Sequence, residues 1–436
     1  MKVIVLGAGV TGITTAWFLQ QRGHEVTVVE RRAQAALETS FANGGQISVS
    51  HAEPWANPGA PLKVLKWLAK EDAPLLFRLR ADMNQWLWGL EFLRNCTPAR
   101  TRHNIKQLVN LGMYSRSTLQ KLRGDLGLEY SALTKGILHF YTSQSEYDDA
   151  QAPASIMREY GCELDMKTAA ECVAIEPALA QCQSSIIGGS MTPSDESGDA
   201  QAFTTALAAK CAEHGVKFLY NTHVVGLQTA GNAISAVEVA KGQGEAGGQI
   251  HQLQADAYVM CLGSFSAQWA KLLGQTLRIY PAKGYSVTLP VINEAASYNV
   301  SLTDDEYKLV FSRLGNRLRI AGTAELGGYN TDLNMVRCQA IVRRVRQLFP
   351  NMTDGQGAQF WTGLRPATPS NVPYIGRSKT SNLFLNTGHG TLGWTHSCGS
   401  GAAIADIVSG KAPEVDFAFT GLAAPKSTHF KAPITA

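Results

Sequence analysis

The sequence lacks the long apolar segments that mark membrane-spanning and secreted proteins. No apolar run reaches the roughly 18 residues of a membrane span. Met1 and Lys2 lead directly into the apolar residues 3–6, which are too few for the core of a signal peptide. We therefore expect a cytoplasmic protein, or one that lies peripherally on the cytoplasmic face of the inner membrane.

Charge and paired cysteines are also scarce. Charged residues make up 17% of the chain, the net charge is +4, and no basic run interleaves with aromatic residues, so we expect no nucleic-acid partner. The 8 cysteines form no CxxC pair and have no zinc-site spacing, which predicts reduced thiols and no metal. With 436 residues, 45% of them hydrophobic, the chain is long enough for two globular domains.

The first thirty residues have the pattern of a nucleotide-binding βαβ unit. Residues 2–6 and 26–30 are predicted as buried strands, and residues 11–22 as a helix that ends at Gly23. Between the first strand and the helix stands a GxGxxG motif, formed by Gly7, Gly9, Val10, Thr11 and Gly12. In this context the glycines allow a tight turn, close approach to a pyrophosphate and packing of the helix on the sheet.

Glu30, at the end of the second strand, is placed to accept hydrogen bonds from a ribose diol, with Arg31 beside it. A carboxylate there repels a 2′-phosphate, so NADP is disfavoured, whereas these residues alone leave FAD and NAD both open.

Two further GxGxxG matches differ in their context. Gly242, Gly244 and Gly247 lie in a polar stretch, 242–249, which reads as the tip of a hairpin. The other match lies between a predicted strand at 383–386 and a predicted helix at 397–409. A loop with free backbone N–H groups before a helix N-terminus favours negative charge, such as that of a reduced flavin. This predicted flavin loop consists of Gly388, His389, Gly390, Thr391, Leu392 and Gly393.

The segment after Glu30 separates FAD from NAD. A polar, glycine-containing loop at residues 38–46 is not needed for NAD, but it resembles the loop that follows the FAD pyrophosphate in amine-oxidising flavoenzymes of the D-amino acid oxidase and glycine oxidase superfamily. The cofactor-binding residues expected here are Ser40, Asn43, Gly44, Gly45, Gln46 and Ile47.

A single arginine, Arg365, stands between an apolar stretch and a proline-rich turn, in the run from Trp361 to Pro369. A guanidinium binds a carboxylate through two parallel hydrogen bonds and stays charged when it is desolvated. Together with residues 38–46, Pro54-Trp55 and 192–199, the run 361–401 resembles the family of small subunits of bacterial D-amino acid dehydrogenases over essentially the whole chain.

The resemblance implies an α/β plus α+β architecture: a Rossmann-like FAD-binding domain with an inserted antiparallel β-sheet substrate domain. We expect residues 1–50, 186–275 and 376–420 in the first domain, 51–185 and 276–375 in the second, and an irregular tail at 421–436. It also implies that Arg365 grips the substrate carboxylate, that the backbone of Val224 meets the adenine, and that Cys261, Leu262 and Gly263 pass the flavin.

The implied reaction is hydride transfer from the Cα of a D-amino acid to flavin N5, followed by hydrolysis of the imine to a 2-oxo acid and ammonia. Electrons would pass to a respiratory-chain quinone or another acceptor. Residues 62–95, rich in Trp, Lys and Arg, could dock on an anionic membrane or could form an ordinary helical face. An oxygen-using oxidase of the glycine or sarcosine type and a non-catalytic electron-transfer subunit are the alternatives.

The sequence departs from the family pattern around the substrate. Gly44 stands where alanine is usual, and His51 lies in a stretch where a tyrosine is expected. Leu392 replaces the second arginine of the glycine oxidase loop, so a second carboxylate ligand must come from elsewhere or be absent. Besides Arg365, the candidate catalytic residues are His51, Tyr285 and Tyr307.

Overall fold

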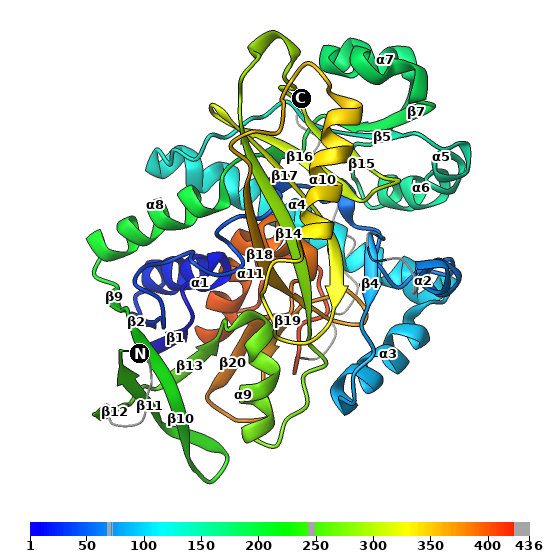
Figure 1. The fold of residues 1–436 in the computed structure, drawn as a ribbon. Helices are drawn as coiled ribbons and strands as arrows, with labels where there is room; N and C mark the ends of the chain where they lie inside the picture. The colour runs from blue at the N-terminus through cyan, green and yellow to red at the C-terminus, as the bar shows by residue number, and fades with distance from the viewer. Residues whose placement is uncertain (68–70, 72, 243–248, 423–436) are drawn as a thin grey trace.

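The computed structural model describes residues 1–67, 71, 73–242 and 249–422. A six-stranded sheet organises one half of the molecule (Figure 1). All neighbouring strands in it run parallel except the edge pair β19–β20. Its order is β19 (Tyr374–Arg377), β20 (Leu383–Thr387), β13 (Ala257–Met260), β1 (Lys2–Leu6), β2 (Glu25–Val29) and β9 (Lys217–Leu219).

Strand β1 is buried on both faces, and its side chains alternate between two apolar cores. Val3 and Val5 belong to the core formed with α1 (Val10–Gln21), α8 (Ala200–Glu213) and α11 (Gly393–Val408). Ile4 and Leu6 face the three-stranded sheet of β10 (Thr222–Ala230), β11 (Ala233–Lys241) and β12 (Ile250–Leu253). The central sheet is therefore covered by helices on one face and by a small antiparallel sheet on the other (Figure 1).

A second, larger sheet forms the other half, and α10 (Met335–Leu348) packs on it through a separate apolar core. It is antiparallel except for the pairs β15–β5 and β17–β4. Its strands are β18 (Gln359–Ala367), β14 (Tyr280–Pro290), β17 (Arg317–Leu326), β16 (Leu309–Leu314), β15 (Ser301–Asp304), β5 (Ile137–Tyr141), β7 (Gly188–Thr192), β6 (Asp165–Thr168) and β4 (Leu75–Phe77).

Helix α4 (Pro98–Leu126) joins the two halves by packing against α11. Thr97 caps its first turn, Pro98 stands at the position where a missing N–H costs nothing, and Gly127 ends it with a left-handed φ of 59°. The remaining elements are α2 (Ala60–Trp67), α3 (Met83–Asn95), α5 (Gln144–Asp149), α6 (Gln151–Glu159), α7 (Ala169–Ile175), α9 (Ser266–Leu272) and the short pair β3 (Gln46–Ile47) and β8 (Glu196–Ser197).

The expected βαβ unit and the strand at 383–386 are confirmed within a few residues. The expected late helix, α11, begins at Gly393 rather than at 397, and β4 and α4 were not predicted. β11 and β12 pair antiparallel as a hairpin requires, while its tip at 243–248 lies outside the described residues. Strand β7 pairs in the larger sheet, although residues 186–275 are expected in the nucleotide-binding domain. The domain boundaries stay a prediction.

In the part of the chain that the structure describes, no helix combines the length and the hydropathy needed to cross a bilayer. All eight cysteines lie in that part and are unpaired.

Candidate active site

A cavity of about 1040 Å³ is lined by residues of both sheets. It begins at the glycine turn after β1 and continues past the flavin loop to strands β14, β17 and β18. Every residue that the sequence suggested for the site lines it except Gly12, Ile47 and Tyr307. The structure therefore brings into one space segments that stand up to several hundred residues apart in the chain.

The three glycines of the first motif have different physical roles. Gly7 needs its positive φ of 101°, and a Cβ on Gly12 would collide with the carbonyl of Gly7, so the fold itself requires both. Gly9 has an ordinary φ of −69°, and a Cβ there would meet nothing nearer than Ser40 Oγ at 3.6 Å. The folded chain thus has no need of glycine at position 9, which faces the cavity and leaves room for a bound pyrophosphate.

Glu30 is held at the mouth of the nucleotide end. Its carboxylate accepts hydrogen bonds from the backbone N–H groups of Ala8 and Arg32, each at 2.8 Å. Burial raises the pKa of Glu30 above its usual value, although the two backbone hydrogen bonds act in the opposite direction. Each oxygen of the Glu30 carboxylate keeps a lone pair that neither bond uses. The group can therefore also accept hydrogen bonds from a ribose diol. Arg31 also lines the cavity and forms an ion pair with Glu38 at 2.7 Å, and Val224 lines the same end of the cavity from β10.

The loop at 40–46 is fixed by hydrogen bonds from both halves of the molecule. Ser40 Oγ accepts from the N–H of Val10 at 3.0 Å, and Asn43 Oδ1 accepts from the N–H of Gly45 at 3.0 Å. Gly45 has a positive φ of 75°. Gln46 Nε2 donates to Leu302 O at 3.1 Å. Ile47 is fully buried in the core behind the loop, so its side chain does not face the cavity.

The flavin loop runs from β20 into α11 as expected. His389 is 3% exposed, and its Nε2 has no hydrogen-bond partner among the described residues. Burial lowers the pKa of His389 to about 3, so the ring is neutral at physiological pH. A buried nitrogen left without a partner indicates that a polar ligand completes the site. Leu392 is buried in an apolar cluster with Val49, so this position supplies no second carboxylate ligand.

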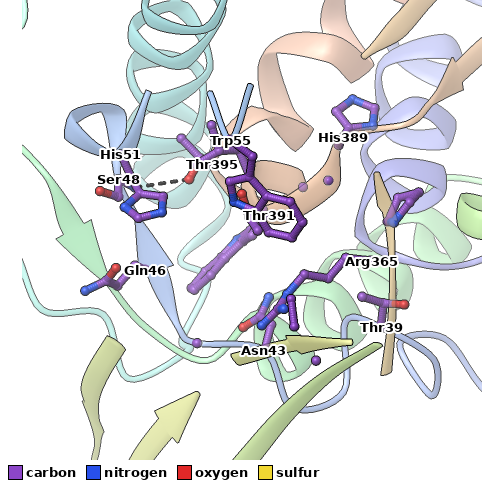
Figure 2. A pocket seen from close by; sticks show the side chains of 18 of the residues that line it. Thr39, Asn43, Gln46, Ser48, His51, Trp55, Arg365, His389, Thr391 and Thr395 are labelled. Atoms are coloured by element: carbon purple, nitrogen blue, oxygen red, sulfur yellow. Dashed lines mark hydrogen bonds between the residues drawn. The ribbon is translucent and has the colours of Figure 1, made fainter. Parts of the chain in front are cut away.

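Arg365 extends from β18 into the cavity (Figure 2). Its Nη1 donates to Thr323 O at 2.8 Å, and no carboxylate of the described residues pairs with it. Burial, followed by the neighbouring cation Arg337, lowers the pKa of Arg365 to about 10, which still leaves a cation at pH 7. A desolvated cation without a counter-ion is costly, and an anionic ligand would remove that cost.

The tyrosine candidates lie differently. The hydroxyl of Tyr285 donates to Glu325 Oε2 at 2.6 Å, and burial followed by that bond raises its pKa, so only the ring is available to the cavity. Tyr307 is 42% exposed in the turn after β15, beneath the guanidinium of Arg344 at 3.8 Å from the ring centre. Tyr307 does not line the cavity, because its ring packs against Arg344 of α10 instead.

His51 ends a single 3-10 turn, Val49–His51, and lies across the cavity from Arg365 (Figure 2). Burial lowers its pKa to about 4, so the ring is neutral. Trp55, four residues further on, also lines the cavity, and its N–H donates to Asn371 Oδ1 at 3.0 Å.

Sequence reasoning missed a polar wall behind His51. The ring of His139 stands 5.9 Å from that of His51, and its Nδ1 lies 2.8 Å from Asp305 Oδ2. Burial alone would raise the pKa of Asp305, yet Lys308 and His139 hold it below its usual value. These residues come from β5 and from the turn after β15, strands whose parallel pairing leaves no signal in the sequence.

Comparison with known proteins agrees with this geometry. The family model described as FAD dependent oxidoreductase matches residues 2–407, and the chain belongs to that family. The cofactor is therefore FAD, as the sequence predicted, and the cavity described above is the candidate site for it. Both the Rossmann-like sheet and the separate, mostly antiparallel sheet are those of the family.

Within the family the chain groups with the D-amino acid dehydrogenases. It is 54% identical over 419 residues to the D-amino acid dehydrogenase of Dechloromonas aromatica, covering 96% of this chain and 99% of that one. It is 50% identical over 412 residues to the D-amino acid dehydrogenase of Paramagnetospirillum magneticum, covering 94% and 96%.

Among solved structures, glycine oxidase from Geobacillus kaustophilus aligns with a TM-score of 0.73 at 22% identity, covering 95% of this chain and 96% of that one. Glycine oxidase from Bacillus cereus aligns with a TM-score of 0.70 at 22% identity, covering 94% and 97%. At this identity the likeness is one of fold.

Proposed function

We propose that the protein oxidises D-amino acids to 2-oxo acids and ammonia with FAD as its oxidant. The observation that carries the proposal is Arg365, a cation inside the flavin cavity that has no carboxylate partner among the described residues. A redox relay has no use for such a group, whereas an enzyme that must hold the carboxylate of an amino acid does.

The residues of the chain bind and orient the substrate. Arg365 holds the carboxylate, and the neutral His51 and the Trp55 ring enclose the opposite side of the cavity. Bound FAD supplies the acceptor for the hydride that leaves Cα. With the amine bound in its neutral form no dedicated base is needed, and orientation alone can supply on the order of 7–11 kcal/mol.

Anaerobic bleaching of the flavin tests this function most directly. The holoenzyme is mixed with D- and L-amino acids in turn while its absorbance is followed. D-amino acids should bleach the flavin within turnover time, and their L-enantiomers should not. A flavin that no amino acid bleaches would instead favour a non-catalytic electron-transfer subunit.

The electron acceptor in this proposal is a membrane quinone rather than oxygen. The outer face of α3 carries four apolar side chains at helical spacing, Met83, Trp86, Leu90 and Leu93, each at least 50% exposed. The opposite face of the same helix is buried through Trp88 and Phe92.

Arginines flank this α3 outer face. Arg80 and Arg94 are exposed at its two ends. An apolar face bordered by cations is suited to an anionic lipid surface. The cavity reaches the inner side of the same region through Val64, Leu75 and Phe92, which offers an apolar acceptor a route toward the flavin.

A further inference from the structure

The backbone of two neighbouring strands supports the guanidinium of Arg365. In the antiparallel pair of β14 and β18, Arg365 lies opposite Ala282, and its side chain crosses to Gly284, two residues along the facing strand. A Cβ built on Gly284 would lie 2.5 Å from Cζ, 2.6 Å from Nη2 and 2.8 Å from Nη1 of Arg365. Such nearly equal distances mean that the flat face of the guanidinium covers the Cα of Gly284.

A β-bulge on the next strand supplies the second support. Gly284 pairs with Ala324 and Tyr285 pairs with Gly322, so Thr323 is an extra residue on β17. Thr323 has a φ of 50°, a left-handed conformation that a β-branched residue rarely adopts. In this conformation its carbonyl accepts the hydrogen bond from Arg365 Nη1 at 2.8 Å.

The strain at Thr323 has no local explanation. Its Oγ1 is buried and has no hydrogen-bond partner among the described residues. No side-chain hydrogen bond therefore compensates for the unusual backbone conformation. Left-handed non-glycine residues persist where the surroundings impose them, and they gather at ligand sites. Here the carbonyl that the bulge turns outward meets the one cation that faces the flavin cavity from β18.

We propose that Gly284 and Thr323 are positioning residues that fix the plane of the Arg365 guanidinium before substrate binds. Gly284 leaves room for the guanidinium to lie flat, and the Thr323 carbonyl holds Nη1. Nε and Nη2 then remain for the two carboxylate oxygens, and neither has a partner among the described residues. Leu392 supplies no second cation at the flavin loop, so preorganisation of Arg365 contributes more to carboxylate binding.

This inference rests on the proposed role of Arg365, and a double-mutant cycle separates the two. Gly284→Ala should raise KM for D-alanine about tenfold to a hundredfold, since a displacement of about 1 Å has effects of that size. It should raise the inhibition constant of propionate, which carries only the carboxylate, by a similar factor, and leave flavin content unchanged. Gly124→Ala, where a Cβ meets nothing within 4 Å, is the matched control.

In the Arg365→Ala background the same Gly284→Ala change should have no further effect, because the group it displaces is gone. Thr323→Gly permits the left-handed φ without a side chain and should keep KM and the propionate constant at their original values. Equal factors for Gly284→Ala in both backgrounds would show a general structural role and overturn the inference. If Arg365→Ala itself left KM and the propionate constant unchanged, the carboxylate assignment would fail instead.

Discussion

Arg116 donates a hydrogen bond to the carboxylate of Asp195 at 2.9 Å, directly behind the turn that carries His51. Asp195 is 0% exposed, and it also accepts from the N–H groups of Val49 and Ser50 at 3.0 Å each. Helix α4 and the segment between β7 and β8 thereby fix the wall of the cavity opposite Arg365.

Asp195→Ala should destabilise the protein by about 3–5 kcal/mol, because it leaves a partly buried cation and two N–H groups without an acceptor. Chemical denaturation of the holoenzyme measures the loss. The matched control is Glu213→Ala, which removes an exposed ion pair with Lys210 and should cost at most about 1 kcal/mol. Similar losses for both variants would contradict the role of Asp195.

Gly9→Val should expel FAD while the chain stays folded. The structure has space for a side chain at this position, but that space is where the pyrophosphate would lie. Absorbance of the purified protein reports flavin content, and circular dichroism reports folding. Gly124→Val on helix α4 controls for the change of residue type. A folded Gly9→Val protein with a full complement of flavin would disprove the site.

Arg365→Ala should lower kcat/KM for D-alanine at least ~100-fold with FAD still bound, since loss of one partner of a buried charged pair costs ~3–5 kcal/mol and each ~1.4 kcal/mol is tenfold in rate. Arg365→Lys should recover only part, because an ammonium cannot form two parallel hydrogen bonds. Melting temperature and kinetics are measured on the same sample. Lower stability with normal kinetics would point to a purely structural arginine.

The α3 outer face should dock the enzyme on the membrane that holds its electron acceptor. Turnover of the purified enzyme should need a dye or a quinone and produce little hydrogen peroxide in air. Trp86→Gln with Leu90→Gln should weaken binding to anionic vesicles and slow reduction of quinone held in them, yet leave dye reduction intact, because both side chains point away from the protein. Peroxide formed at the rate of the dye assay would favour the oxygen-using oxidase.

Acid should destabilise the protein through buried neutral histidines. His396 is 1% exposed, its Nε2 lies 3.2 Å from Leu108 O, and burial lowers its pKa from 6.5 to about 4. The folded pKa lies below the unfolded one, so this stabilisation is complete above pH 6.5 and is lost as the pH falls toward 4.

His396→Asn should therefore flatten the decline in unfolding free energy over that interval by about 1.4 kcal/mol per pH unit. Denaturant titrations at about pH 7, 6 and 5 measure the slope of the unfolding free energy against pH. Exposed His103→Asn is the control, because solvent already surrounds that ring in the folded chain. An unchanged slope in His396→Asn would refute the assignment.

The nucleotide end of the site could be predicted from the sequence because its parts are local. Gly7, Gly9 and Gly12 lie in one turn, and Glu30 is the residue that follows the next strand, so one βαβ unit brings them together whatever the rest of the chain does. The flavin loop before α11 is local in the same sense. Arg365 was predictable from its motif, although its surroundings were not.

The substrate end depended on pairings between distant strands. His139 meets Asp305 because β5 and β15 run parallel, and Asp195 reaches Val49 across 146 positions of the chain. Nothing in the sequence distinguishes Tyr285 from Tyr307 as a candidate, yet the first is buried beside the cavity and the second is exposed outside it. The sequence shows which side chains are present that could line the site. The register of the larger sheet, with its bulge at Thr323, decides which of these side chains face the cavity and how Arg365 is held. Only the tertiary structure shows that register, because packing and not local preference sets it.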